Sequence, residues 1–313
     1  MMRWLILLIM AMVAAIPSQA QAQRRIAISF DGAPRSAGAW LTPDGRTSML
    51  IAGLREAGVP QAAFFVNPGF LARADGAGGE ARIAAYVAAG HVIANHGFSH
   101  QRLSATAVDV YIADIDAAEV WLADRPGRRP WFRFPYLDEG RADRVKRDAL
   151  RAALAQRGLS NGYVTIDASD WNIENLTKAA VAAGTPIDRT RLRDHYVRAH
   201  VEAADFYDRL AVQTLGRSPA HMLLLHETDI AALFIADLVA ALRADGWTII
   251  GADEAYADPI ARAIPETRSA QGTLIEAMAW ERGLPAPRWY RYNDVDLATA
   301  RFRRDVLGEE ETP

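Results

Sequence analysis

The chain has 313 residues, of which 50% are apolar and 23% are charged, and it contains no cysteine. This composition is typical of a globular protein with a sizeable core. The 35 Lys and Arg residues against 38 Asp and Glu residues give a formal net charge of −3, so no nucleic acid partner is expected. Without cysteine, disulfide scaffolds, thiolate zinc sites and cysteine nucleophiles are excluded. Any metal must therefore be held by His, Asp or Glu.

The first 22 residues have the layout of a bacterial secretory signal peptide. A positive charge at Arg3 precedes an apolar run over 4–16, and the segment ends in the small-residue pattern AQA at 20–22. The apolar run is shorter than the roughly 20 residues that a membrane-spanning helix needs. No cysteine is present to receive a lipid. The sequence therefore predicts cleavage after Ala22, a periplasmic or secreted protein, and no stable membrane anchor.

Seven short β-type runs follow in chain order, and most of them are separated by helical stretches. The runs cover 26–30, 62–66, 92–94, 131–134, 163–166, 222–225 and 248–250. Four of them follow a glycine placed where a helix C-cap needs a left-handed residue. This alternation predicts an α/β fold in which helices surround a parallel sheet. The pattern alone fits a barrel and an open doubly wound sheet equally well.

Two further segments extend this repeating unit. A peripheral helix is predicted over 188–215, inside an insertion rich in Arg and Ala. The tail beyond Asp258 is less periodic, but its Trp and Tyr residues predict that it packs on the body of the protein. We therefore expect a signal peptide over 1–22, one domain over 23–257 and a C-terminal extension over 258–313. The sequence does not indicate an oligomeric state.

Polar side chains follow the predicted strands at their carboxyl ends, the edge that carries active sites in parallel α/β folds. They are Asp31, His96, His100, Arg133, Tyr136, Asp170 and His226. Most have a purely structural explanation when taken singly, such as a turn or a helix N-cap. The four-residue step from His96 to His100 is more informative, because it places two imidazoles on one face, where they suit a divalent metal.

Five motifs in fixed order resemble those of the polysaccharide deacetylases, the NodB-homology carbohydrate esterases of family four. They are SFDGAP over 29–34, NHGFSH over 95–100, RFPY over 133–136, DASDW over 167–171 and LLLH over 223–226. An ordered set is much more specific than any single motif. The resemblance covers about residues 25–255. It implies a distorted (β/α)7-type barrel, here with an extra helical insertion and a C-terminal extension, and so favours the barrel over the open sheet.

The resemblance also implies an activity, the removal of N-acetyl groups from glycans that contain N-acetylglucosamine, with an acetylated polysaccharide or oligosaccharide as the partner. His96 and His100 match the histidine ligands of a divalent metal, with Zn²⁺ expected first and Co²⁺ or Ni²⁺ as alternatives. Asp31 matches the general base. Arg133 matches the residue that holds this base, and a guanidinium there is expected to keep Asp31 ionised.

The remaining matched residues concern the substrate and the leaving group. The backbone N–H of Tyr136 matches the donor to the tetrahedral oxyanion. His226 matches the general acid that protonates the departing amine, and Asp170 matches its carboxylate partner. Trp171 and Leu224 match the apolar walls around the acetyl methyl group.

Gly32 departs from the family pattern, which usually has a second aspartate there as the third metal ligand. Several alternatives follow. The two histidines and solvent hold the metal with lower affinity; Asp31 becomes a ligand and the base is lost; the protein only binds glycans; or Gly32 is an introduced inactivating substitution. A metal-free esterase or glycosidase that pairs Asp31 with another carboxylate, such as Asp138 or Glu139, is a further alternative. Peptidoglycan, chitin-like oligomers, poly-N-acetylglucosamine and O-acetylated xylan fit the motifs equally well as substrates.

Overall fold

The computed structural model describes residues 23–267 and 270–309, so the predicted signal peptide lies outside the described residues. The strands are β1 (Arg25–Ala33), β2 (Ala63–Val66), β3 (Val92–Asn95), β4 (Arg128–Phe132), β5 (Asp138–Arg141), β6 (Ser160–Asn161), β7 (Ile166–Asp167), β8 (Ala220–His226), β9 (Thr248–Ile249) and β10 (Ala270–Gln271). The α-helices are α1 (Pro43–Glu56), α2 (Gly79–Ala88), α3 (Val108–Leu122), α4 (Arg144–Gln156), α5 (Asp170–Ala182), α6 (Arg189–Leu215), α7 (Asp229–Ala244), α8 (Ala252–Tyr256), α9 (Leu274–Glu281) and α10 (Val295–Phe302).

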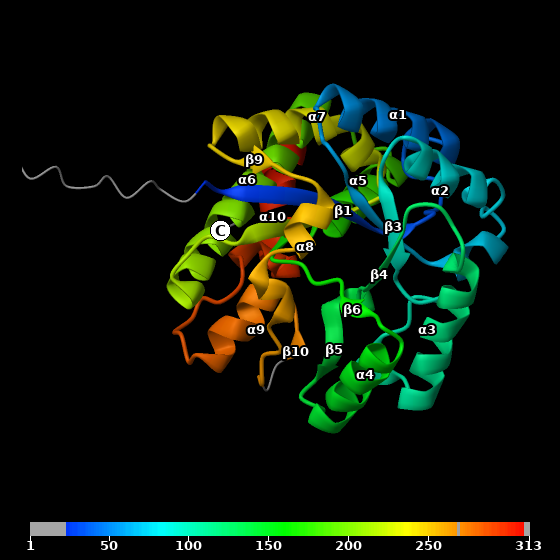
Figure 1. Ribbon diagram of the computed structural model, residues 1–313. Helices are drawn as coiled ribbons and strands as arrows, with labels where there is room; N and C mark the ends of the chain where they lie inside the picture. Colours follow the sequence, from blue (N-terminus) through cyan, green and yellow to red (C-terminus); the bar gives the residue numbers. More distant parts are fainter. Residues whose placement is uncertain (1–22, 268–269, 310–313) are drawn as a thin grey trace, which may run out of the picture.

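The main sheet is parallel and has the strand order β6-β4-β3-β2-β1-β8-β7, with β9 paired to the start of β1. Helices lie around its outside (Figure 1). Its two edge strands belong to one extended segment: Ser160 pairs with Trp131 of β4, and Ile166 pairs with Leu223 of β8. A single segment that joins both edges makes the sheet curve into an incomplete barrel. The predicted α/β barrel is thus confirmed, although only Ile166 of the fifth predicted run, 163–166, lies in a strand, at the start of β7.

The central strand β1 determines where the site lies. Its side chains are buried on both faces, with Ile28 and Phe30 in the large core cluster under the helices and Ala27 in a smaller cluster inside the barrel. Burial on both faces is typical of parallel strands and explains the continuous apolar sequence. β1 pairs with β8 without a shift, from Arg25 opposite Ala220 to Asp31 opposite His226. Register alone therefore places these two polar side chains next to each other.

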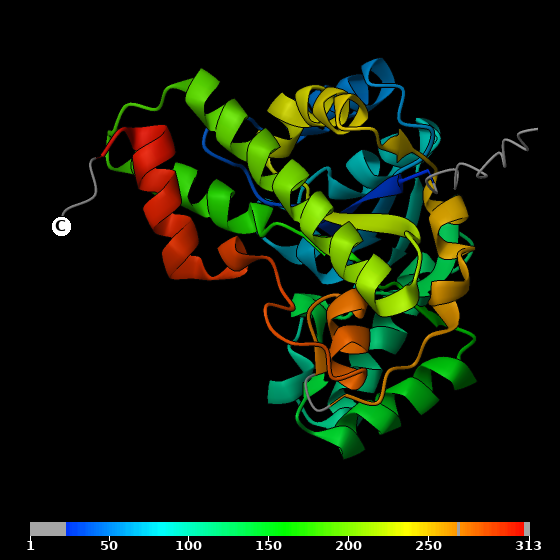
Figure 2. The same cartoon turned by 90° about the vertical axis from the view of Figure 1, so that its left-hand side faces the viewer.

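The helical insertion is dominated by α6, which runs across one side of the molecule (Figure 2). Asp188 caps the helix by accepting hydrogen bonds from the backbone N–H groups of Thr190 and Arg191. Gly216 ends it with a φ of 76°, a left-handed conformation that glycine adopts without strain. The helix predicted over 188–215 is therefore confirmed to within one residue. It packs against α7 on one side and α9 on the other.

The segment after Asp258 lies against this body. In α9, Leu274, Ile275 and Met278 belong to the large core cluster, as does Phe302 at the end of α10. The short strand β10 pairs antiparallel with β5. Burial of several large apolar side chains, each stabilising the fold by roughly 1.5–3 kcal/mol, fixes these elements on the barrel.

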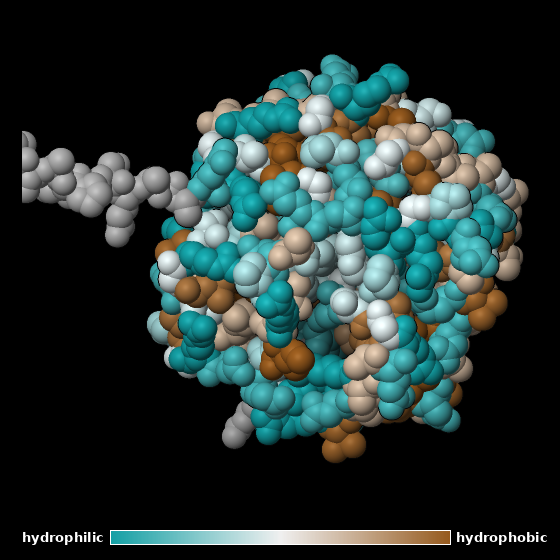
Figure 3. Space-filling view, viewed as in Figure 1, coloured by the Kyte–Doolittle hydropathy of each residue, from teal (hydrophilic) through white to brown (hydrophobic). Residues whose placement is uncertain are grey.

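On the face shown in Figure 3, apolar residues are scattered among hydrophilic ones rather than gathered in one broad patch. Across the described part of the chain, no helix combines the length and the apolar character needed to span a bilayer.

Candidate active site

A cavity of about 920 Å³ contains the residues to which the sequence motifs point. Seven of the predicted residues line it, and they come from separate loops and strand ends: Asp31, His96, His100, Tyr136, Trp171, Leu224 and His226. The other two, Arg133 and Asp170, lie directly behind this lining, where they contact Asp31 and His226 respectively. The fold thus brings together all nine residues, as expected for the carboxyl ends of parallel strands.

Asp31, at the end of β1, is buried and held by Arg133. Arg133 Nη1 donates to Asp31 Oδ1 at 2.6 Å. The same guanidinium donates to Ser29 Oγ at 2.8 Å, to the Gly162 carbonyl at 2.7 Å and to the Tyr256 hydroxyl at 2.8 Å, so its position is fixed. Burial raises the pKa of Asp31, and the nearby Arg133 opposes this without cancelling it. The expected contact between Arg133 and Asp31 is present, and burial makes this carboxylate a better proton acceptor.

His96 and His100 lie on the loop after β3. The Nδ1 atom of His96 lies 2.9 Å from the Arg133 carbonyl oxygen and must carry the proton of that hydrogen bond. Its Nε2 lone pair is left free, 3.6 Å from Asp31 Oδ2. The two imidazole rings are 4.9 Å apart between centroids, and His100 has a φ of 61°, so a tight turn rather than a helix brings them together. Burial lowers the pKa of each histidine to about 3.

These histidines supply only part of a metal site. Neutral imidazoles are the form that binds a divalent metal, and they fit that chemistry. Within residues 23–267 and 270–309, however, no three His, Asp or Glu side chains are arranged to hold a metal ion together. Gly32 has a φ of +78°, and a Cβ built on it would lie 3.3 Å from Arg35 Nη1. A guanidinium therefore faces the place from which the missing third ligand would project.

His226 and Asp170 form a second pair on the pocket wall. Asp170 begins α5, and His226 ends β8. The carboxylate accepts two hydrogen bonds from His226, from its backbone N–H and from its Nδ1, each at 2.7 Å. Burial by itself would raise the pKa of Asp170, but the contact with His226 lowers it. This bidentate contact fixes the imidazole so that Nε2 is the atom left to act on a ligand.

Tyr136, Trp171 and Leu224 complete the part of the lining predicted from the sequence. Tyr136 lies in a turn after β4 with a φ of 60°, and its ring contacts His100 at 4.6 Å between centroids. The Arg102 guanidinium stacks on the same ring at 4.0 Å. Leu224 is buried on β8, and Trp171 is partly exposed at the start of α5.

Sequence reasoning missed a substantial part of the cavity lining. The missed residues are Arg35, Arg102, Leu137, Asp167, Ser169, Asn175, Gln271, Gly272, Glu276, Trp280, Trp289 and Asn293. Burial raises the pKa of Glu276 to about 8 and that of Asp167 to about 6. The pattern T-x-x-E at 273–276 is a recognisable capping box and could have indicated the start of α9. No sequence signal shows that this helix faces the cavity.

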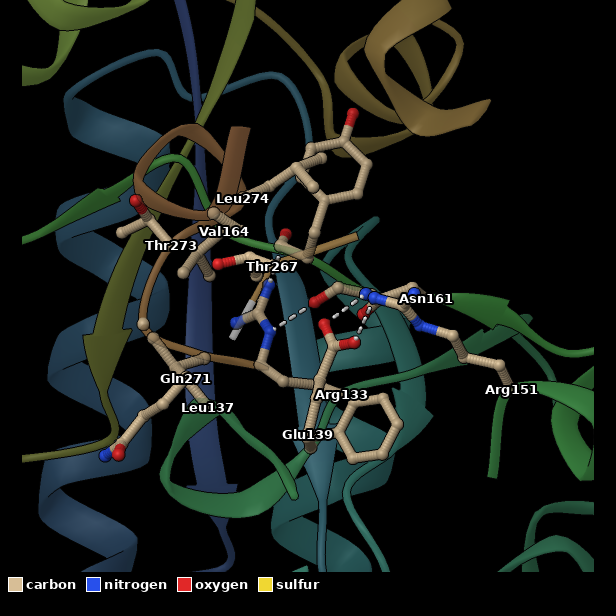
Figure 4. Close-up of a pocket in the computed structure, with 15 residues that line it drawn as sticks. Arg133, Leu137, Glu139, Arg151, Asn161, Val164, Thr267, Gln271, Thr273 and Leu274 are labelled. Carbon is tan, nitrogen blue, oxygen red and sulfur yellow. Dashed lines mark hydrogen bonds and ion pairs between the residues drawn. The ribbon is translucent and has the colours of Figure 1, made fainter. Parts of the chain in front are cut away.

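The alternative that pairs Asp31 with Asp138 or Glu139 is not supported by their positions. Asp138 is buried and accepts hydrogen bonds from Ser104 and Gly140. Glu139 points into a separate, small pocket (Figure 4), where it accepts hydrogen bonds from Arg151 and Asn161. Neither carboxylate lines the cavity that holds Asp31. The paired carboxylates that flank a sugar in glycosidases are therefore not formed by these residues.

The fold and the site define a barrel with a buried acid–base constellation, and comparisons with known proteins show what the chain is similar to. Residues 18–159 match the family model described as polysaccharide deacetylase. The match covers somewhat less than half of the chain, and it agrees with the resemblance that is based on the ordered motifs. A search of the curated proteins found no match.

Several solved structures are similar. The chitin deacetylase from the fungal pathogen Colletotrichum lindemuthianum matches with a TM-score of 0.51 and 16% identity over 76% of this chain and 90% of that chain. A mutant family 4 pseudoenzyme with restored enzymatic activity matches with a TM-score of 0.50 and 13% identity over 75% of this chain and 68% of that chain. The family 4 carbohydrate esterase from Streptomyces lividans, in complex with acetate, has 22% identity over 74% of this chain and 95% of that chain, with a TM-score of 0.48. At these identities the likeness concerns the fold.

Proposed function

We propose that the protein is a secreted, metal-dependent polysaccharide deacetylase that hydrolyses the N-acetyl groups of glycans containing N-acetylglucosamine. One observation carries the proposal: the unshifted pairing of β1 with β8 places Asp31 opposite His226. Each of the two side chains has its own partner, Arg133 for Asp31 and Asp170 for His226. An amide hydrolase needs a proton acceptor and a proton donor on one pocket, and these pairs supply both.

The first half of the reaction uses Asp31. Its carboxylate accepts the proton of the attacking water, while Arg133 fixes the orientation of the carboxylate. The water oxygen forms a bond to the acetyl carbonyl carbon, and the carbonyl oxygen becomes an oxyanion. The backbone N–H of Tyr136 is the proposed donor to that oxyanion, in the manner of a preorganised oxyanion hole.

The second half uses His226. Its Nε2 donates a proton to the glycan nitrogen as the bond between that nitrogen and the carbonyl carbon breaks. Acetate and a glycan with a free amine are the products. Asp170 keeps the imidazole in the required tautomer and orientation because it binds both Nδ1 and the backbone N–H. Trp171 and Leu224 form the walls proposed for the acetyl methyl group.

A divalent cation bound to His96 and His100 would lower the pKa of a bound water and polarise the acetyl carbonyl. Zn²⁺ suits imidazole donors, as do Co²⁺ and Ni²⁺. Because position 32 supplies no carboxylate, we expect weaker binding than at a site with three protein ligands. Addition of metal should therefore raise activity in a concentration-dependent way.

The test measures acetate released from chito-oligosaccharides, peptidoglycan fragments, poly-N-acetylglucosamine and acetylated xylan, with and without added zinc. The matched control is Asp31→Asn, which keeps the shape of the side chain and removes the base. Acetate release that requires Asp31 supports the proposal. Glycan binding without acetate release from any of these substrates, with metal in excess, would show a binding protein instead. Export is tested separately, by whether the protein recovered from the periplasm or medium lacks residues 1–22.

A further inference from the structure

The C-terminal segment contributes a large part of the cavity wall. Of the nineteen residues that line the cavity, six come from 271–293: Gln271, Gly272, Glu276, Trp280, Trp289 and Asn293. This segment lies beyond the matched part of the family model, which ends at residue 159. It includes α9 and the loop that leads to a short 3-10 helix over Arg291–Asn293. We call residues 271–293 the C-terminal wall.

Two tryptophans of this wall line the cavity and are partly exposed. Trp280 is 40% exposed and Trp289 is 46% exposed, although burying an aromatic side chain is normally favourable. The Arg288 guanidinium stacks on the Trp280 ring at 3.9 Å and so occupies one of its faces. An exposed aromatic ring that lines a pocket is available to pack against the apolar face of a ligand.

Hydrogen bonds of neighbouring residues hold the segment that carries these tryptophans. Glu276 lies one helical turn before Trp280, so both side chains project from the same face of α9. Glu276 Oε1 accepts a hydrogen bond from the Tyr207 hydroxyl of α6 at 2.5 Å. Asn293 donates to the same hydroxyl and to the Asp167 carbonyl, each at 3.1 Å. The wall is therefore fixed to α6 and to the end of β7 on both sides of the loop that carries Trp289.

The chemistry of this wall matches a carbohydrate ring. A pyranose has faces made of C–H groups, which pack on indole rings, and a rim of hydroxyls, which pair with carboxyl and amide groups. The wall offers Trp280 and Trp289 together with the carboxyl of Glu276 and the amide of Gln271, and Asn175 lines the cavity nearby. At about 920 Å³, the cavity is at the upper end of the range for drug-sized ligands and exceeds the needs of one monosaccharide.

We infer that the C-terminal wall is a sugar-binding subsite, in which Trp280 and Trp289 pack against pyranose rings next to the one that carries the reacting acetyl group. The inference rests on the proposed function for the identity of that reacting group. It assigns the protein a preference for oligosaccharides over monosaccharides. A rigid wall supports such a preference, because no loop has to be ordered when the glycan binds.

The experiment compares binding and turnover of N-acetylglucosamine and its tetramer by wild type, Trp280→Ala, Trp289→Ala and Trp289→Phe. Isothermal titration calorimetry is done on the Asp31→Asn background so that no turnover occurs. The alanine variants should lower the tetramer-to-monomer affinity ratio about tenfold each, the scale of one aromatic stacking contact. The Trp289→Phe variant, which keeps an aromatic ring, should retain most of the wild-type tetramer-to-monomer affinity ratio. Trp121→Ala, on α3 and outside the cavity lining, is the matched control and should leave the ratio unchanged.

The two proposals fail in different ways. If the alanine variants keep the wild-type affinity ratio while all proteins are folded, the sugar-binding subsite is wrong, even if acetate is released. If the alanine variants lower the affinity ratio as expected but the wild type releases no acetate, the sugar-binding subsite is supported and the proposed deacetylase activity is wrong. Circular dichroism and the thermal midpoint of each variant show whether a lost ratio reflects misfolding. Recovery of the ratio by Trp289→Phe then supports the aromatic contact directly.

Discussion

Replacing Gly32 with aspartate tests whether the missing carboxylate is the only defect in the metal site. The backbone at this position has a φ of +78°, where residues other than glycine cost about 1–2 kcal/mol, and less for aspartate. A Cβ there lies 3.3 Å from Arg35 Nη1. The new carboxylate would therefore pair with Arg35, which offsets roughly 0.2–1 kcal/mol of the strain because the pair is partly exposed. We expect a net loss of about 1 kcal/mol and a thermal midpoint lowered by about 2–4 °C.

The same geometry predicts that Gly32→Asp alone gains little metal affinity. Its carboxylate is neutralised by Arg35, so it is not free to serve as a third ligand. Adding Arg35→Ala removes this competitor and the nearby positive charge. The double variant should then bind Zn²⁺ at least about tenfold more tightly than wild type, the scale on which even the partners of metal ligands act. The Arg35→Ala variant alone should gain less affinity for Zn²⁺, because this substitution supplies no ligand.

Isothermal titration calorimetry with ZnCl₂ on the wild type, both single variants and the double variant measures these affinities. Differential scanning fluorimetry on the same proteins measures the thermal midpoints. If Gly32→Asp alone bound zinc as tightly as the double variant, Arg35 would not compete for position 32. A wild type that bound zinc as tightly as the double variant would show that the site is already complete.

Three further variants test the acid, the buried carboxyl and the arginine support. Asp170→Asn should lower kcat by about 10²–10⁴-fold at an almost unchanged KM, because the proton donor loses its orientation; a loss below threefold would contradict the role of His226. Glu276 has a pKa of about 8 when folded against an ordinary value of 4.5, so the folded state holds its proton more tightly than the unfolded chain. Its contribution to the free energy of unfolding, on the order of a few kcal/mol, is present below about pH 4.5 and is lost as the pH rises through 8. Chemical denaturation should show this decline in the wild type and not in Glu276→Gln. Tyr256→Phe removes one of the acceptors of Arg133 and should cost about 1 kcal/mol of stability while lowering kcat several-fold; an unchanged kcat would mean that this bond does not position Asp31.

The sequence predicted the α/β alternation and the sheet edge that carries the candidate site because those features depend on local, periodic signals. Alternating helices and buried strands fix the sheet, and parallel strands place their carboxyl ends on one edge. The pair of Asp31 and His226 follows from strand register once β1 and β8 are neighbours. The barrel arrangement was predicted only from the resemblance to the family, because the periodicity fitted an open sheet equally well.

The remaining part of the site depends on contacts between residues far apart in the chain, and such contacts leave no periodic pattern in the sequence. Arg35 lies three residues after Gly32, yet only the turn geometry shows that its guanidinium faces position 32. Trp280 and Trp289 were recognised as signs of a packed tail, but not as cavity residues. The segment that carries them is held by the contact of Glu276 with Tyr207, 69 residues earlier in the chain. A motif also does not report that burial raises the pKa of Asp31 against the effect of the neighbouring arginine.

The central claim is that the described acid–base constellation cleaves the acetyl amide of a glycan and leaves the glycan chain intact. Mass spectrometry of a chito-oligosaccharide of defined length, incubated with the protein and zinc, tests this directly. We expect products of unchanged chain length that have lost acetyl groups, together with free acetate, and no such products with Asp31→Asn. Shorter chains that keep every acetyl group, or an unaltered substrate at saturating metal, would contradict it.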